Sequence, residues 1–220
     1  MPRRMKRGGK RAPRRYRRKA KKAVVVNRAL APIAQRYITK MKFAADVSTG
    51  ADGFMRFNLN SIYDPLRSGS ASPDQPYGRD TLATLYNRYR VISCGWRIQA
   101  PNTGGNIMVG CIPANETYTT TSFADIRENP RAKYYTQHAT GAVQLLKGKV
   151  YIPSLVGRTK SQYMADDRYQ SQIDANPVEL AILNVGVAAT NGGMLTTGQI
   201  LNVLFEYTVE FFDIKTLTSS

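Results

Sequence analysis

Apolar and polar side chains alternate along most of the chain beyond residue 35. The clearest case is LNVLFEYTVEFFD (201–213), in which every second residue from Leu201 to Phe211 is apolar and Glu206 and Glu210 lie between them. A period of two is that of a β-strand with one buried face. Eight segments are predicted to be strands on this basis: 36–47, 53–60, 89–99, 106–113, 133–139, 142–152, 178–188 and 200–213.

Three segments are predicted to be helical: 79–89, 121–129 and 157–169. The first has Asp80 near its start and helically spaced leucines and tyrosines, and the second starts with Ser and Thr. Two long connections, 63–78 and 153–177, are rich in Ser, Pro, Asp and Gly.

The predicted fold class is all-β. Eight strands without a β-α-β rhythm favour an eight-stranded antiparallel jelly-roll sandwich with short helices in its loops. An immunoglobulin-like sandwich is the weaker alternative, because it requires about seven strands in roughly 100 residues and a Cys…Trp…Cys order. Here Trp96 follows Cys94 by only two positions.

The charge divides the chain into two parts. The net charge is +17, yet Asp46 is the first acidic residue, and seventeen Lys or Arg precede it. From Asp46 onward there are fifteen basic and fifteen acidic residues. We therefore predict a basic arm, residues 1–35, followed by a neutral domain, residues 36–220.

Residues 1–22 hold thirteen Lys or Arg and no carboxylate. Such a segment buries too little apolar surface to offset its ordering entropy, so it is predicted to be disordered when free. Phosphates are its natural partners, because each neutralised phosphate releases a counterion and the Arg fork fits phosphate oxygens. The predicted nucleic-acid-binding residues are Arg3, Arg4, Lys6, Arg7, Lys10, Arg11, Arg14, Arg15, Tyr16, Arg17, Arg18, Lys19, Lys21, Lys22, Arg28, Arg36, Lys40 and Lys42.

A cluster of Lys and Arg has two other common uses. Clustered Lys and Arg also form nuclear localisation signals, a use compatible with nucleic-acid binding. A membrane-surface patch is disfavoured because no apolar anchor accompanies the charge. No apolar run approaches the roughly 20 residues of a transmembrane helix, so no membrane insertion is predicted.

Little in the sequence indicates catalysis, and the chain is predicted not to be an enzyme and to have no cofactor. His138 is the only histidine, so a metal site with several histidine ligands is excluded. A Ser-His-Asp triad would have to use His138, which is predicted to lie in a strand. Two cysteines, Cys94 and Cys111, are too few for a disulfide framework and are predicted to be free and buried. Calcium at subunit contacts is the one alternative, through acidic residues in loops: Asp46, Asp52, Asp166, Asp167 and Asp174.

One segment, YDPLRSGSASPDQPYGRDTLATLYNRYRV (63–91), resembles the capsid proteins of small icosahedral viruses. The similarity is to circovirus-like, Rep-encoding single-stranded DNA viruses and to satellite viruses with single jelly-roll shells. The residues that carry it are Asp64, Pro65, Gln75, Pro76, Gly78, Asp80, Tyr86, Tyr89 and Val91.

The resemblance implies a self-assembling shell of about 60 copies with T=1 symmetry, in which the arms bind a single-stranded genome. It implies DNA in preference to RNA, a place in the virion and in the host nucleus during assembly, and contacts with a nuclear import receptor and a cell-surface receptor. Long loops would supply the outward and intersubunit surfaces.

Two further hypotheses stay open. A non-viral nucleic-acid-binding protein with a β-sandwich body would explain the arm equally well, but the sequence predicts no basic stripe on the body. A jelly-roll enzyme or lectin with a basic tail is disfavoured by the single histidine and by the lack of a secretory signal. Self-association distinguishes the first two hypotheses.

Overall fold

The computed structural model describes residues 33–50, 53–67, 75–101, 105–115, 122–191, 195 and 198–216. The predicted disorder of the arm concerns residues that lie almost wholly outside these ranges. The described residues all belong to one compact unit that begins at Ile33. Its elements are β1 (Arg36–Ser48), β2 (Phe54–Asn58), α1 (Arg79–Ala83), β3 (Tyr86–Gln99), β4 (Ile107–Ala114), α2 (Phe123–Glu128), β5 (Lys133–Gln137), β6 (Leu146–Tyr151), α3 (Ile152–Leu155), α4 (Lys160–Ala165), the 3-10 helix η1 (Asp167–Tyr169), β7 (Ser171–Gln172), β8 (Ile182–Ala189) and β9 (Ile200–Ile214).

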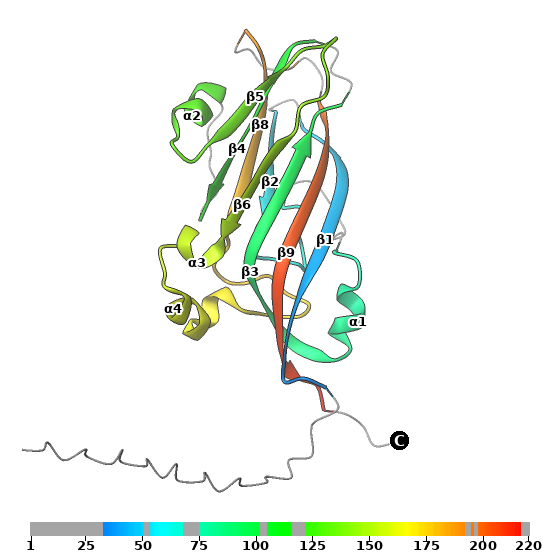
Figure 1. Cartoon of the computed structure of the whole chain (residues 1–220), viewed down its shortest axis with the longest axis vertical. Coiled ribbons are helices and arrows are strands. Elements are labelled where there is room, and N and C mark those ends of the chain that lie inside the picture. The colour runs from blue at the N-terminus through cyan, green and yellow to red at the C-terminus, as the bar shows by residue number, and fades with distance from the viewer. Residues whose placement is uncertain are drawn as a thin grey trace, which may run out of the picture. The chain divides into compact units, whose positions relative to one another are not determined.

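The strands form two antiparallel sheets (Figure 1). One sheet has the order β1-β9-β3-β6, with the short β7 paired to β3, and the other has the order β2-β8-β4-β5. The chain crosses repeatedly between the sheets: β1, β3, β6, β7 and β9 lie in the first and β2, β4, β5 and β8 in the second. This winding is the jelly roll that the sequence predicts, and the all-β fold class is confirmed.

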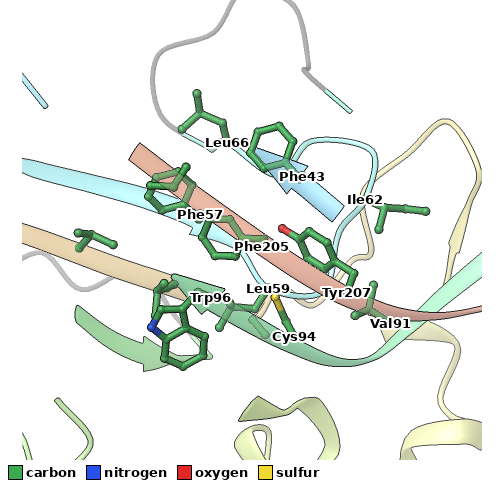
Figure 2. Close-up of a cluster of buried hydrophobic side chains, with 14 of the residues drawn as sticks. Phe43, Phe57, Leu59, Ile62, Leu66, Val91, Cys94, Trp96, Phe205 and Tyr207 are labelled. Atoms are coloured by element: carbon green, nitrogen blue, oxygen red, sulfur yellow. The ribbon is translucent and has the colours of Figure 1, made fainter. Parts of the chain in front are cut away.

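The core lies between the two sheets (Figure 2). β9 contributes its odd-numbered side chains from Leu201 to Phe211, all buried, while its even-numbered positions face outward. Phe205 is at the centre of the cluster, with its ring 5.0 Å from that of Phe57 on the opposite sheet. The Tyr207 hydroxyl donates to the Asn58 carbonyl at 2.9 Å and also links the sheets.

The strand predictions need small corrections. A ninth strand, β7, has only two residues, too few for any periodicity to show. The segment 142–152 becomes a strand only at Leu146, and its last residue, Ile152, already begins α3, where Pro153 occupies a first-turn position that suits proline. The segment 178–188 becomes a strand only at Ile182.

The predicted helix 79–89 is wrong beyond Ala83. Tyr86 and Tyr89 are both buried, so their spacing satisfied a helical pattern, but they belong to β3 and pair with the end of β9. A five-residue helix gains little by propagation, whereas extended pairing along β9 continues over fourteen residues of β3. Segment 157–169 likewise divides into α4 and η1, and the prediction for 121–129 is confirmed as α2.

The segment that resembles capsid proteins has a structural role at one end of the sandwich. Gly78 has a φ of 81°, in the region that favours glycine, and immediately precedes α1. The Arg79 guanidinium is buried and donates to Gln75 Oε1 at 2.8 Å, to Asp80 Oδ1 at 2.9 Å and to the Ile173 carbonyl. The long connections before α1 and after α4 are thereby joined.

Two glycines on neighbouring strands allow a stability prediction. A Cβ added to Gly148 would lie 2.3 Å from Trp96 Cζ2, whereas one added to Gly95 would meet nothing nearer than 3.6 Å. We expect Gly148→Ala to cost about 1–3 kcal/mol of unfolding free energy, because the rigid indole must move. Gly95→Ala should change it by less than about 0.5 kcal/mol. Denaturant unfolding of both variants measures the difference, and equal stabilities would contradict this packing of Trp96.

Candidate nucleic-acid interface

Most of the predicted nucleic-acid-binding residues, from Arg3 to Arg28, lie outside the described residues. The three that the structure describes, Arg36, Lys40 and Lys42, are on β1. All three are exposed and occupy even-numbered positions of β1, and the odd-numbered side chains Met41 and Phe43 enter the core. β1 therefore presents them together on the outer face of the β1-β9-β3-β6 sheet.

Arg36 lies beside a buried carboxylate. Its Nη1 is 3.5 Å from Glu210 Oε1, and Arg90 Nη1 lies 3.9 Å from Glu210 Oε2. Glu210 and Arg90 are almost fully buried, and burial lowers the pKa of the Arg90 guanidinium, an effect that Glu210 opposes. Arg90 also donates to Gln170 Oε1 at 2.9 Å and lies over the Phe212 ring. The charge of Arg36 is thus partly balanced within the fold.

Lys40 and Lys42 flank a second carboxylate. Lys40 Nζ lies 3.0 Å from Glu206 Oε1, and this contact, with weaker contributions from Lys42 and Lys149, lowers the pKa of Glu206. Lys42 is directly opposite Glu206 in the β1–β9 register but makes no ion pair with any described residue. Of the three predicted residues, Lys42 has the charge most free to meet a phosphate.

The fold adds cations that the sequence reasoning missed. Lys42 is in register with Glu206, Gly95 and Lys149 across four strands, and in the next row Ala44 is in register with Leu204, Arg97 and Lys147. Lys133 of β5 reaches the same place and donates from Nζ to the Lys147 carbonyl at 3.1 Å. These residues surround a groove of about 360 Å³, called here the cationic groove. Its five cations are Lys42, Arg97, Lys133, Lys147 and Lys149.

The prediction that the body carries no basic stripe is therefore wrong. The charges balance along the sequence, but strand pairing places five cations around one hollow. Only the alternation of Lys147 and Lys149 in LKGKV signalled a shared face, whereas the strand order brings Arg97 there and Lys133 comes from β5 of the other sheet.

A second hollow continues from the cationic groove around β6. It has a volume of about 410 Å³, shares Trp96, Lys133 and Lys149 with the cationic groove, and adds Arg131 and Tyr151. Trp96 is buried, with its indole against Gly148, while Tyr151 is exposed. Tyr16, the aromatic residue predicted to stack on a base, lies outside the described residues.

Three of the five acidic residues considered as calcium ligands, Asp166, Asp167 and Asp46, have other partners. Asp166 accepts from Arg168 Nη2 at 2.8 Å, which with further hydrogen bonds lowers its pKa to about 2. Asp167 accepts from Gln170, and Asp46 accepts from Asn202. Asp52 lies outside the described residues. Within the described part of the chain, no group of three or more His, Cys, Asp or Glu is arranged to hold a metal.

Cys94 and Cys111 are free and buried, as predicted, and burial raises the pKa of Cys111 to about 12. His138 is exposed at the end of β5. No helix in the described ranges has the length and hydropathy needed to cross a membrane.

Comparison with known proteins finds likeness in structure only. No protein-family model and no curated protein matches the sequence. Among solved structures, an empty head of turnip yellow mosaic virus has 13% identity, covers 91% of this chain and 94% of its own, and has a TM-score of 0.47. A nora virus structure has 13% identity, 96% and 69% coverage and a TM-score of 0.49. The 60-mer BFDV capsid protein has 8% identity, 86% and 100% coverage and a TM-score of 0.43.

These structural neighbours are viral capsid proteins. They come from viruses of plants, such as turnip yellow mosaic virus, and of animals, such as a nodavirus of the giant freshwater prawn. The identities are 13% or lower and the TM-scores are below 0.5, so the likeness concerns the fold alone.

Proposed function

We propose that this chain is a viral capsid (coat) protein that self-assembles into a small icosahedral shell and packages a single-stranded genome through its arm. The observation that carries the proposal is the separation of charge from fold: residues 1–35 hold fourteen Lys or Arg and no acidic residue, whereas the jelly roll from Arg36 onward holds eighteen basic and fifteen acidic residues. The capsid-like segment 63–91 supports the same function.

Many copies of such a protein can bind one nucleic-acid molecule through their arms, while their jelly rolls contact one another. In a shell of about 60 subunits, a charge of +17 each supplies on the order of 1,000 positive charges for genome phosphates. Arms brought together without nucleic acid repel one another, and phosphates remove that repulsion. Genome binding would therefore promote shell closure.

Contacts between subunits would come from the neutral domain, which close copies can approach without strong repulsion. Exposed apolar side chains in its long loops are suited to such contacts. Tyr77 and Val178, which are 96% and 79% exposed, lie in the two connections that Arg79 joins. The long loops would also bind the cell-surface receptor.

The finer assignments follow from the resemblance in segment 63–91. They are a T=1 shell, DNA in preference to RNA as the packaged strand, and a second use of the arm as a nuclear localisation signal during assembly. No catalytic step is proposed for this protein.

Sedimentation velocity of the purified protein over a range of concentrations and salt tests the proposal. A capsid protein should pass from a small species to one fast, sharp boundary, because closed shells have a fixed number of subunits. A non-viral nucleic-acid binder, the second candidate, should remain small or form broad, nucleic-acid-dependent boundaries. A single slow boundary under all conditions would contradict the capsid assignment.

A further inference from the structure

The cationic groove concentrates positive charge that the folded domain leaves unbalanced. Its five cations are all exposed, and none forms an ion pair with a described residue. Glu206 is the only acidic residue that lines the groove, and its carboxylate is bound by Lys40 from outside the lining. Like charges at this spacing repel one another, so an anion in the groove would relieve repulsion as well as gain attraction.

The floor of the cationic groove is shaped for an extended ligand. Gly95 lies in the outer row between Glu206 and Lys149 and carries no side chain, which leaves a hollow where neighbouring strands present longer residues. The groove opens toward the second hollow, where Arg131 adds a sixth cation and Tyr151 an exposed ring. Cations in a row beside an aromatic ring are typical of sites that follow the backbone of a single strand.

We propose that the cationic groove binds the phosphodiester backbone of a single nucleic-acid strand, as a contact separate from the arm. This inference rests on the proposed packaging function and identifies a second site for it on the folded domain. Lys42 lies six residues along β1 from Arg36, which is about 20 Å of extended chain. A strand held by the arm can thus continue to the groove along the outer face of β1, where Arg36, Lys40 and Lys42 lie and only the exposed Ile38 interrupts the cations.

The chain provides its own reporter for this site. Trp96 is the only tryptophan, and it lines both hollows. Its indole is buried against Gly148, beside both hollows, so we expect a strand in the groove to change its emission, which has no second source in the arm. The experiment titrates the full chain with an oligodeoxythymidylate of about six nucleotides, the scale of single-strand sites, and follows Trp96 emission.

Matched pairs of substitutions test whether the Trp96 response depends on the charges of the groove. Lys147→Gln with Lys149→Gln removes two groove charges, and Arg158→Gln with Lys160→Gln removes two exposed charges that line neither hollow. The groove pair should weaken the Trp96 response about tenfold or more and reduce the salt slope by about 1.4, while the control pair leaves both nearly unchanged. Glu206→Gln should instead tighten the response, because it removes the one negative charge.

Gly95→Val provides a test that leaves every charge in place. The added side chain projects into the hollow, and the first carbon meets only ordinary contacts. The response should be lost or weakened at least tenfold, while thermal unfolding by circular dichroism verifies that each variant is folded. If a groove-pair variant fails to fold, Gly95→Val and Glu206→Gln still test whether the groove binds the oligonucleotide.

Three results would overturn the proposal: no Trp96 response to the oligonucleotide, an equal response in the groove and control pairs, or a response to heparin but not to the oligonucleotide. The last would assign the groove to a sulfated polysaccharide. These results are distinguishable from failure of the capsid function, because the groove assay requires no shell. A full-length protein that forms shells while groove variants bind normally would retain the proposed function and lose only this site.

Discussion

Deleting residues 1–32 should abolish most nucleic-acid binding and leave the jelly roll folded. Fourteen Lys or Arg are removed, while Ile33 and Ala34, which contact the folded domain, are kept. If about ten to fourteen phosphates are neutralised on a single strand, the full chain has a slope of log K against log salt of about −7 to −10. Without the arm, the cationic groove alone should give a slope of about −3. Affinity at low salt should fall by several orders of magnitude.

Fluorescence anisotropy with a long labelled single strand, repeated at several salt concentrations, measures both quantities. A full-length variant in which the thirteen cations of residues 1–22 become Gln separates charge from chain length, and it should behave like the deletion. If either protein kept the wild-type salt slope, assigning binding to the arm would be wrong.

Phe205→Ala should produce the largest loss of stability among single core substitutions. Phe205 is fully buried, lies 5.0 Å from Phe57 and 6.4 Å from Phe43 between ring centroids, and packs between the two sheets. Truncation removes the ring and leaves a cavity that rigid strands on both sides cannot fill. The expected cost is about 3–5 kcal/mol of unfolding free energy.

Leu204→Ala is the matched control, because Leu204 is the adjacent residue on β9 and faces the opposite, half-exposed side. It should cost about 1 kcal/mol or less. Denaturant unfolding of unassembled protein at one concentration measures both variants, since assembly would add its own stabilisation. Equal losses would show that β9 does not bury its odd-numbered face as described.

The alternation of β9 made the fold predictable. Six buried residues at every second position specify which face enters the core, and a register slip of one residue would expose all of them. The same pattern located β1, β3 and β4 within a few residues. The sequence could not reveal that β3 begins at Tyr86, because two buried tyrosines three apart satisfy a helix as well as a strand that is buried on both faces at its start.

The cationic groove shows a different limit. Lys42 was predicted from its closeness to the arm, but Arg97, Lys133, Lys147 and Lys149 are separated from it by 55 to 107 residues of sequence. Only the strand order β1-β9-β3-β6 and the proximity of β5 bring them together. Charge counted along a chain is neutral here, whereas charge on one face of the sheet is not.

The most direct test of the central claim is whether the protein forms closed particles that protect nucleic acid. Purified protein would be treated with nuclease, separated on a sucrose gradient and imaged by negative-stain electron microscopy, with absorbance at 260 and 280 nm recorded in each fraction. The capsid assignment predicts uniform closed shells that hold nuclease-resistant nucleic acid and lose it when residues 1–32 are deleted. A small, slowly sedimenting species with fully degraded nucleic acid, at every salt and pH, would contradict it.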